Sequence, residues 1–197
     1  MKKITLITII LGVIMIANAQ ENSENSGTDT VQFVPRNELK MTPEITEMLI
    51  YNAYWMHKND SDEELSRFGI KDRSQLDNLH LGKPFPKYTL VNNNLKFLNQ
   101  WNILVMSEDE PLFITTVRLM EDGRYRWAGS GSAEGARILY NYKHKDLIIG
   151  DLDDYPRSYL IIRKDNKDIF VEGYDYATQE YLKNEYSLNE VINHKKK

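Results

Sequence analysis

The chain has 197 residues, of which 41% are hydrophobic and 27% are charged, and these values are typical of a globular protein. They exclude a chain that is disordered throughout and a protein with several membrane spans. The formal charge of −4 argues against a nucleic-acid-binding domain, and the absence of cysteine excludes disulfides, thiol nucleophiles and cysteine metal sites.

The N-terminus has the pattern of a secretory signal peptide. Lys2 and Lys3 precede an apolar run over residues 4–16, which ends at Ala17-Asn18-Ala19. A basic start, a short apolar run and a small-x-small junction are what signal peptidase accepts. The run is about 13 residues long, too short to cross a bilayer as a helix. We therefore expect residues 1–19 to be cleaved off, with no stable membrane span afterwards.

The Met-Lys-Lys start and the junction over residues 17–20 resemble the Sec signal peptides of Bacteroidota. This resemblance covers the leader alone. It implies export in a Gram-negative cell, to the periplasm or to the extracellular side.

The next segment is polar. Residues 20–30 contain no apolar side chain, and residues 31–40 are transitional. A segment that cannot bury apolar surface stays outside the core. The sequence thus predicts a flexible spacer over residues 20–40, followed by a single domain over residues 41–197.

The first third of that domain is predicted to be helical. Thr42-Pro43-Glu44 is typical of a helix start, and apolar residues follow at helical spacing. Ser61-Asp62-Glu63-Glu64 is a capping box that opens a second helix, which Gly69 ends. A third short helix is expected over residues 72–80.

The chain after Pro84 is predicted to form strands. Two prolines near the start of the first strand indicate a sheet edge, and apolar residues of both parities over 112–120 indicate a central strand. One helical turn is expected over residues 95–100, and Ser132 is expected to cap a helix running to about residue 143. The predicted strands are 85–91, 101–106, 112–120, 124–129, 147–150, 157–163 and 167–174.

Helices followed by hairpin-linked strands are typical of α+β domains. We expect N-terminal helices packed on a mostly antiparallel sheet of about six to seven strands, with the Ser132 helix as the single crossover. A second capping box at Ser187-Leu188-Asn189-Glu190 predicts a last short helix.

Asp122-Gly123 is the strongest hairpin signal. A two-residue turn there would place Arg118 across from Trp127, beside Tyr125. One interpretation is an aromatic and basic patch that binds a sugar, a peptide or an anion. The alternative is a cation–π contact that only stabilises the hairpin.

The segment from Gly129 to Gly135 joins a predicted strand to a predicted helix. Its backbone N–H groups, with Ser130 and Ser132, are candidates for binding an anion at the helix N-terminus. The segment lacks the P-loop, dinucleotide and nucleophile-elbow patterns. The alternative is a tight turn with a serine cap.

Metal and cofactor sites are not indicated. The four histidines, at positions 57, 80, 144 and 194, lack metal-ligand spacing and are interpreted as structural. The acidic run of Asp151, Asp153 and Asp154 does not fit a calcium-binding loop and is interpreted as a solvated turn.

The C-terminal part is rich in tyrosine, which is favoured at interfaces because its ring is apolar and its hydroxyl can stay hydrated. A partner surface is therefore a candidate here, made by Tyr174, Tyr176, Tyr181 and Tyr186.

These patterns favour a secreted or periplasmic, non-catalytic binding or accessory module, whose partner is an envelope protein or a glycan and not a nucleic acid. One alternative is an envelope hydrolase that uses Ser132 or Ser130 with a distant histidine, His80 or His144. Another is an inhibitor or immunity-type protein. The sequence names no ligand and no characterised family for the mature domain.

Overall fold

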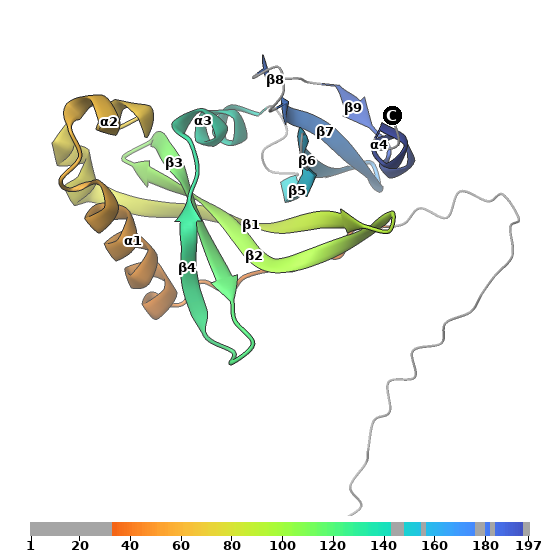
Figure 1. The fold of residues 1–197 in the computed structure, drawn as a ribbon, viewed down its shortest axis with the longest axis horizontal. Helices are drawn as coiled ribbons and strands as arrows, with labels where there is room; N and C mark the ends of the chain where they lie inside the picture. The colour runs from red at the N-terminus through yellow and green to blue at the C-terminus, as the bar shows by residue number, and fades with distance from the viewer. Residues whose placement is uncertain (1–32, 143–147, 155–156, 176–179, 182–183, 195–197) are drawn as a thin grey trace, which may run out of the picture. The chain divides into compact units, whose positions relative to one another are not determined.

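The computed structural model describes residues 33–142, 148–154, 157–175, 180–181 and 184–194 (Figure 1). Residues Val31–Lys197 form one compact unit. The predicted signal peptide, the spacer up to residue 32, His144 and Tyr176 all lie outside the described residues.

Most helix starts follow the capping residues. Thr42 caps the first helix, and Ser61 and Glu64 form the predicted capping box of the second. The third is a 3-10 helix that ends at Asn78, because Leu79 already pairs with Ser107 in the sheet. None of the described helices is long and apolar enough to cross a membrane. The helices are α1 (Pro43–His57), α2 (Asp62–Arg67), η1 (Arg73–Asn78), α3 (Ala133–Asn141) and α4 (Leu188–His194).

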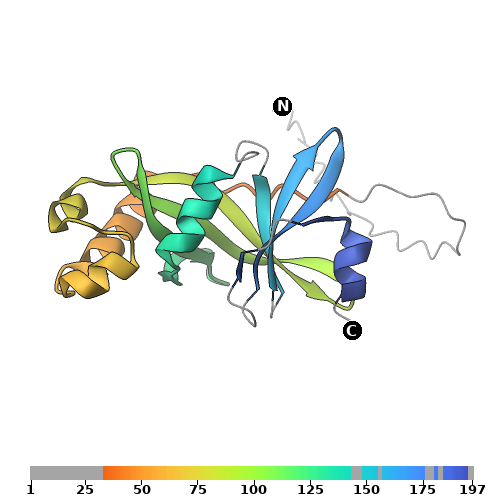
Figure 2. The same ribbon diagram turned by 90° about the horizontal axis from the view of Figure 1, so that it is seen from above.

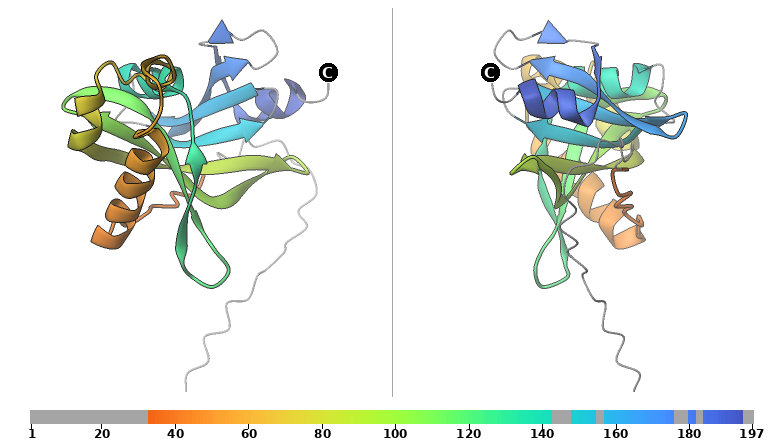
Figure 3. Two further views of the ribbon diagram at one scale, coloured as in Figure 1. Left: turned by 60° about the vertical axis from the view of Figure 1, so that its left-hand side comes forward. Right: turned by 90° about the vertical axis from the view of Figure 1, so that its right-hand side faces the viewer.

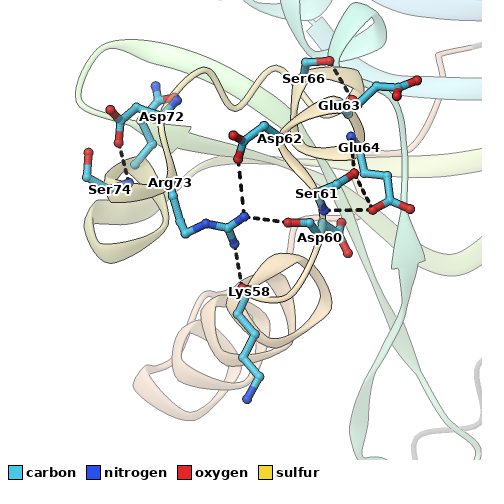
Figure 4. A network of polar contacts seen from close by, with 11 residues as sticks. Lys58, Asp60, Ser61, Asp62, Glu63, Glu64, Ser66, Asp72, Arg73 and Ser74 are labelled. Carbon is cyan, nitrogen blue, oxygen red and sulfur yellow. Dashed lines mark hydrogen bonds and ion pairs between the residues drawn. The ribbon is translucent and has the colours of Figure 1, made fainter.

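One arginine ties the first three helices together (Figure 4). The Arg73 guanidinium donates to the carbonyl oxygens of Lys58, at 2.7 Å, and Asp60, at 2.6 Å. It also lies 3.5 Å from the Asp62 carboxylate. Carbonyls at the end of a helix have no partner within the helix, so this contact satisfies them and fixes α1 against α2 and η1.

The sheet contains nine strands in the described residues, more than the six to seven predicted. Its order is β4-β3-β2-β1-β5-β6-β7-β8, with β9 also paired to β7. Among the described strands only β1 and β5 pair in parallel, so the α+β class and the mostly antiparallel sheet are confirmed. The strands are β1 (Leu79–Val91), β2 (Asn94–Ser107), β3 (Glu110–Leu119), β4 (Tyr125–Ser130), β5 (Ile148–Asp154), β6 (Arg157–Lys164), β7 (Lys167–Asp175), β8 (Glu180–Tyr181) and β9 (Glu185–Tyr186).

Strand β1 corrects two predictions. It continues directly into β2 through Asn92 and Asn93, which have φ of 51° and 64°, so the expected helical turn at 95–100 is wrong. Asparagine tolerates this left-handed conformation, which a two-residue hairpin needs. β1 also lies between β2 and β5 and is not an edge. Its prolines are tolerated because Pro84 and Pro86 sit at breaks in the pairing register with β2.

The β3–β4 hairpin has a three-residue loop. Met120 N donates to Arg124 O at 2.9 Å, and Gly123 N donates to Met120 O at 3.0 Å, with Gly123 at φ 77°. This is a type I turn followed by a left-handed glycine. The register therefore pairs Arg118 with Arg126, and the predicted pairing of Arg118 with Trp127 is wrong by one residue.

Alternate residues of β2 pack on opposite faces of the sheet. Ile103 shares a core cluster with Leu49 of α1, whereas Leu104 shares one with Leu139 of α3. α1 and α3 thus cover opposite faces of strands β1 to β4 (Figure 3). Helix α4 packs against β7 (Figure 2), where Val191 joins the cluster of Phe170. Apolar clusters therefore lie on both sides of the sheet.

Part of the predicted spacer belongs to the domain. Val34 is 3% exposed, and its carbonyl accepts from Arg163 at 2.8 Å. The indole N–H of Trp101 donates to the carbonyl of Asn37 at 2.6 Å. Residues 33–40 are therefore not a flexible spacer. Their partners lie far away in the sequence, and the buried side chains of Val34 and Leu39 anchor the segment together with these hydrogen bonds.

Candidate functional site: a polar pocket beside helix α3

The site arises where the α3 side of the sheet changes from apolar to polar. Along β2, Met106 and Leu104 are followed at the next two alternate positions by Asn102 and Gln100. Helix α3 packs on the apolar pair through Leu139. Beyond that contact, the polar part of this face forms one wall of a pocket of about 630 Å³.

The pocket draws residues from strands β1 to β7 and from α3. Its apolar lining includes Ile114, Ile138 and Leu139. Its polar and charged side chains include Lys87, Gln100, Asn102, Thr116, Ser130, Ser132, Glu134, Asp151, Asp153 and Ser158.

A directed chain of hydrogen bonds crosses the floor of the pocket. The hydroxyl of Thr116 donates to Asn102 Oδ1 at 2.8 Å, and Asn102 Nδ2 donates to Asp151 Oδ2 at 2.6 Å. Lys87 Nζ lies 3.4 Å from Oδ2 of Asp153, which is two residues after Asp151 in β5 and therefore on the same face of the strand. The three groups Thr116, Asn102 and Asp151 therefore form one connected polar network that ends on a carboxylate.

Two polar atoms in the pocket lining have no hydrogen-bond partner within the described part of the chain. They are Asp151 Oδ1 and Ser130 Oγ, and both are shielded from solvent. A buried polar atom without a partner costs about 1–3 kcal/mol and calls for a specific explanation. A ligand that fills the pocket would provide one.

The pKa of Asp151 is raised from 3.8 to about 6. Burial is the main cause and the neighbouring Asp153 acts in the same direction, whereas Lys87 and the hydrogen bond from Asn102 act to lower this pKa. This carboxyl therefore titrates close to neutral pH. Strongly shifted carboxyls in a pocket are typical of functional sites. The prediction of a solvated turn at Asp151 is wrong, because this residue lies in β5, where it pairs with Lys87 of β1 and Leu160 of β6.

The predicted glycine-rich segment contributes to the pocket. Ser130 and Ser132 both line it. Ser132 also caps α3, since its hydroxyl accepts from Gly135 N at 3.1 Å. The predicted helix cap at Ser132 is thus confirmed. Ser130 Oγ is one of the two unpartnered atoms described above.

The predicted aromatic and basic patch is not assembled. Arg118 lies next to the pocket. With the Gln100 amide turned so that its oxygen faces the guanidinium, Arg118 Nε donates to this oxygen at 2.9 Å. Tyr125 and Trp127 pack on the opposite face, in the cluster under α1. The indole N–H of Trp127 donates to Thr115 Oγ1 at 3.2 Å. The one-residue difference in register separates these side chains.

No hydrogen bond joins Ser130 or Ser132 to a histidine in the ranges that the structure describes. His80 is exposed and pairs with Met106. His57 is buried, with Nδ1 2.8 Å from Asp60 Oδ2. The same ranges hold no group of three side chains arranged to bind a metal ion.

The tyrosines near the C-terminus lie in different environments. Tyr174 and Tyr181 pair across β7 and β8. Tyr186 is half-buried, and its hydroxyl donates to Glu172 Oε2 at 3.2 Å, which indicates a structural role. Sequence analysis missed a different aromatic group, on α1, where Tyr51, Tyr54 and Trp55 are exposed.

Comparison of the chain with protein-family models, with characterised proteins and with solved structures finds no match. The mature domain therefore matches no characterised family, and its function has to be inferred from the pocket itself.

Proposed function

We propose that the protein is an exported, non-catalytic binding module, and that its ligand is a small polar molecule held in the pocket beside α3. The observation that supports this most strongly is Asp151 Oδ1, a shielded acceptor without a partner in the described residues, in a pocket of about 630 Å³. Pockets that hold small molecules have this size and combine apolar walls with a few converging polar groups. Export is supported by the leader pattern at residues 1–19 alone.

The raised pKa of Asp151 favours a second candidate, an enzyme that uses this carboxyl as a general acid or base. The catalytic group of such an enzyme would be Asp151, whereas the hydrolase hypothesis drawn from the sequence relies on Ser130 or Ser132. Turnover of a bound ligand, lost in Asp151→Asn, would favour this candidate over the binding module.

Ligand binding is tested by ¹H–¹⁵N NMR with small probes of different charge: cadaverine, glucosamine, N-acetylglucosamine, 1,5-pentanediol and glutarate. We expect at least one probe to shift the amide signals of Ser130, Asp151 and Ser158. Ser130→Ala should weaken that binding by about 3- to 10-fold, the value of one hydrogen bond.

The matched control is Trp55→Ala on the exposed face of α1. This substitution should leave the affinity unchanged, because Trp55 does not line the pocket. If Trp55→Ala abolishes binding while Ser130→Ala does not, the ligand binds on α1 and the proposed site is wrong.

A further inference from the structure

Resting on the proposed function, we infer that the ligand of this pocket is a small molecule with a protonated amino group, which donates to Asp151 Oδ1, on a short carbon framework. Three features of the pocket support this inference: the direction of its hydrogen bonds, the balance of its charges and its apolar wall.

The direction of the hydrogen bonds determines which kind of ligand group can bond to Asp151. Thr116 donates to Asn102, and Asn102 donates to Asp151 Oδ2, so every bond in the chain points toward the carboxylate. An ionised carboxylate only accepts, and Oδ1 has no partner in the part of the chain that is described. A ligand must therefore offer a donor at this position, and an ammonium offers three donors and no acceptor.

The charges favour a cation over a neutral donor. Among the described lining residues, the charged side chains are three carboxylates, on Glu134, Asp151 and Asp153, and one ammonium, on Lys87. The Arg118 guanidinium lies next to the pocket and bonds to Gln100. The Lys87 ammonium is held 3.4 Å from Asp153, not on Asp151 Oδ1. Lys87 stabilises the Asp151 carboxylate electrostatically but does not bond to Oδ1. A shielded carboxylate oxygen without a donor is costly, and a hydrogen bond between two charged groups is about twice as strong as a neutral one.

A metal ion does not fit the same position. Calcium takes six to eight oxygen ligands, and magnesium requires a nearly ideal octahedron. The described residues contain no group of three acidic or histidine side chains placed to bind an ion. Ile114, Ile138 and Leu139 instead provide an apolar wall for the carbon framework of an organic amine.

The inference is tested by isothermal titration calorimetry with matched pairs of probes. Cadaverine is compared with 1,5-pentanediol, and glucosamine with N-acetylglucosamine, so that each pair differs at the amino group. At pH near 7.5 we expect an amine to bind at least about 10-fold more tightly than its neutral partner. Which of the two amines binds more tightly separates a linear amine from an amino sugar.

Two variants separate the role of Asp151 from the general negative charge of the protein. Asp151→Asn keeps the size of the side chain and its hydrogen bond from Asn102, and should weaken amine binding by about 10-fold or more. Glu63→Gln removes an exposed carboxylate of α2 that does not line the pocket, and should change the affinity less than about threefold.

The pH dependence tests the same carboxylate in the unmodified protein. Lys87, Asp153 and Glu134 are the other charged groups among the described lining residues, and Arg118 lies next to the pocket. Amine affinity should fall as the pH is lowered from about 7.5 to 5, because Asp151 becomes protonated, and this fall should be absent in Asp151→Asn.

The outcomes are distinguishable. If neutral probes or glutarate bind in the pocket as tightly as the amines, or if the amine affinity is independent of Asp151 and of pH, the inference is wrong while the proposed function stands. If none of the five probes shifts the pocket signals at millimolar concentration, both are wrong.

Discussion

Asp151→Asn is expected to stabilise the protein at about pH 8, by about 1–3 kcal/mol in the free energy of unfolding. The pKa of Asp151 rises from 3.8 to about 6 on folding, chiefly through burial. The folded state therefore binds the proton more tightly than the unfolded state. The stability that protonated Asp151 contributes is fully present below about pH 4 and is lost as the pH rises through 6. The asparagine side chain stays neutral and avoids this loss.

The measurement is urea denaturation of the two proteins between about pH 4 and pH 8. The difference in unfolding free energy should grow with pH and level off above about pH 7. Asp153→Asn is the matched control, since Asp153 is 45% exposed and its ion pair with Lys87 is worth less than about 1 kcal/mol. A destabilised Asp151→Asn variant at pH 8 would show that this carboxylate supports the fold, and not ligand binding.

Gly150→Ala is expected to destabilise the fold by about 3 kcal/mol or more. A Cβ atom at Gly150 would lie 2.7 Å from Tyr88 Cε2 and 3.0 Å from the carbonyl oxygen of Pro86. Tyr88 is 1% exposed, and β1 is held between β2 and β5, so neither neighbour can move aside cheaply. The close approach occurs next to the parallel pairing of β1 with β5, one residue before Asp151.

Gly123→Ala is the matched control for this prediction. Gly123 has φ of 77°, and a methyl group added there would meet no atom within 4 Å, so alanine should cost only about 1 kcal/mol of backbone strain. Chemical denaturation of both variants gives the comparison. Equal stability losses would mean that β1 and β5 are not packed as closely as the structure indicates.

The helix starts could be predicted from the sequence because a cap is a local contact. Thr42, Ser61, Ser132 and Ser187 each accept from a backbone N–H three residues later. Such contacts need no knowledge of the rest of the fold. The predictions of these four helix starts are accordingly confirmed.

The sheet is harder to predict because its register depends on loop geometry. Asp122-Gly123 predicts a two-residue turn, but Gly123 closes a three-residue loop, and this difference moves Trp127 to the other face. The asparagines at 92–94 indicate a turn, but Asn92-Asn93 has no glycine at either position, so the sequence does not show that strand β2 follows the turn directly.

The pocket is predictable only in part. The glycine-rich segment indicates Ser130 and Ser132, which do line it. Asp151 is not recognisable as a site residue in the sequence. Its hydrogen-bond partner Asn102 lies 49 residues earlier in the chain, and the two meet only when the sheet forms. One local signal is present: Gln100 and Asn102 alternate with Trp101 and Ile103, which places two amides on one face of a strand.

The most direct test of the proposed site is a ¹³C NMR titration of the Asp151 carboxyl carbon, in the free protein and with saturating cadaverine or glucosamine. We predict a pKa of about 6 in the free protein, since burial raises it. We predict a lower pKa with bound amine, because a cation stabilises the ionised form. A pKa near the ordinary aspartate value of about 4 that neither amine changes would contradict both the shielded acceptor and its proposed ligand.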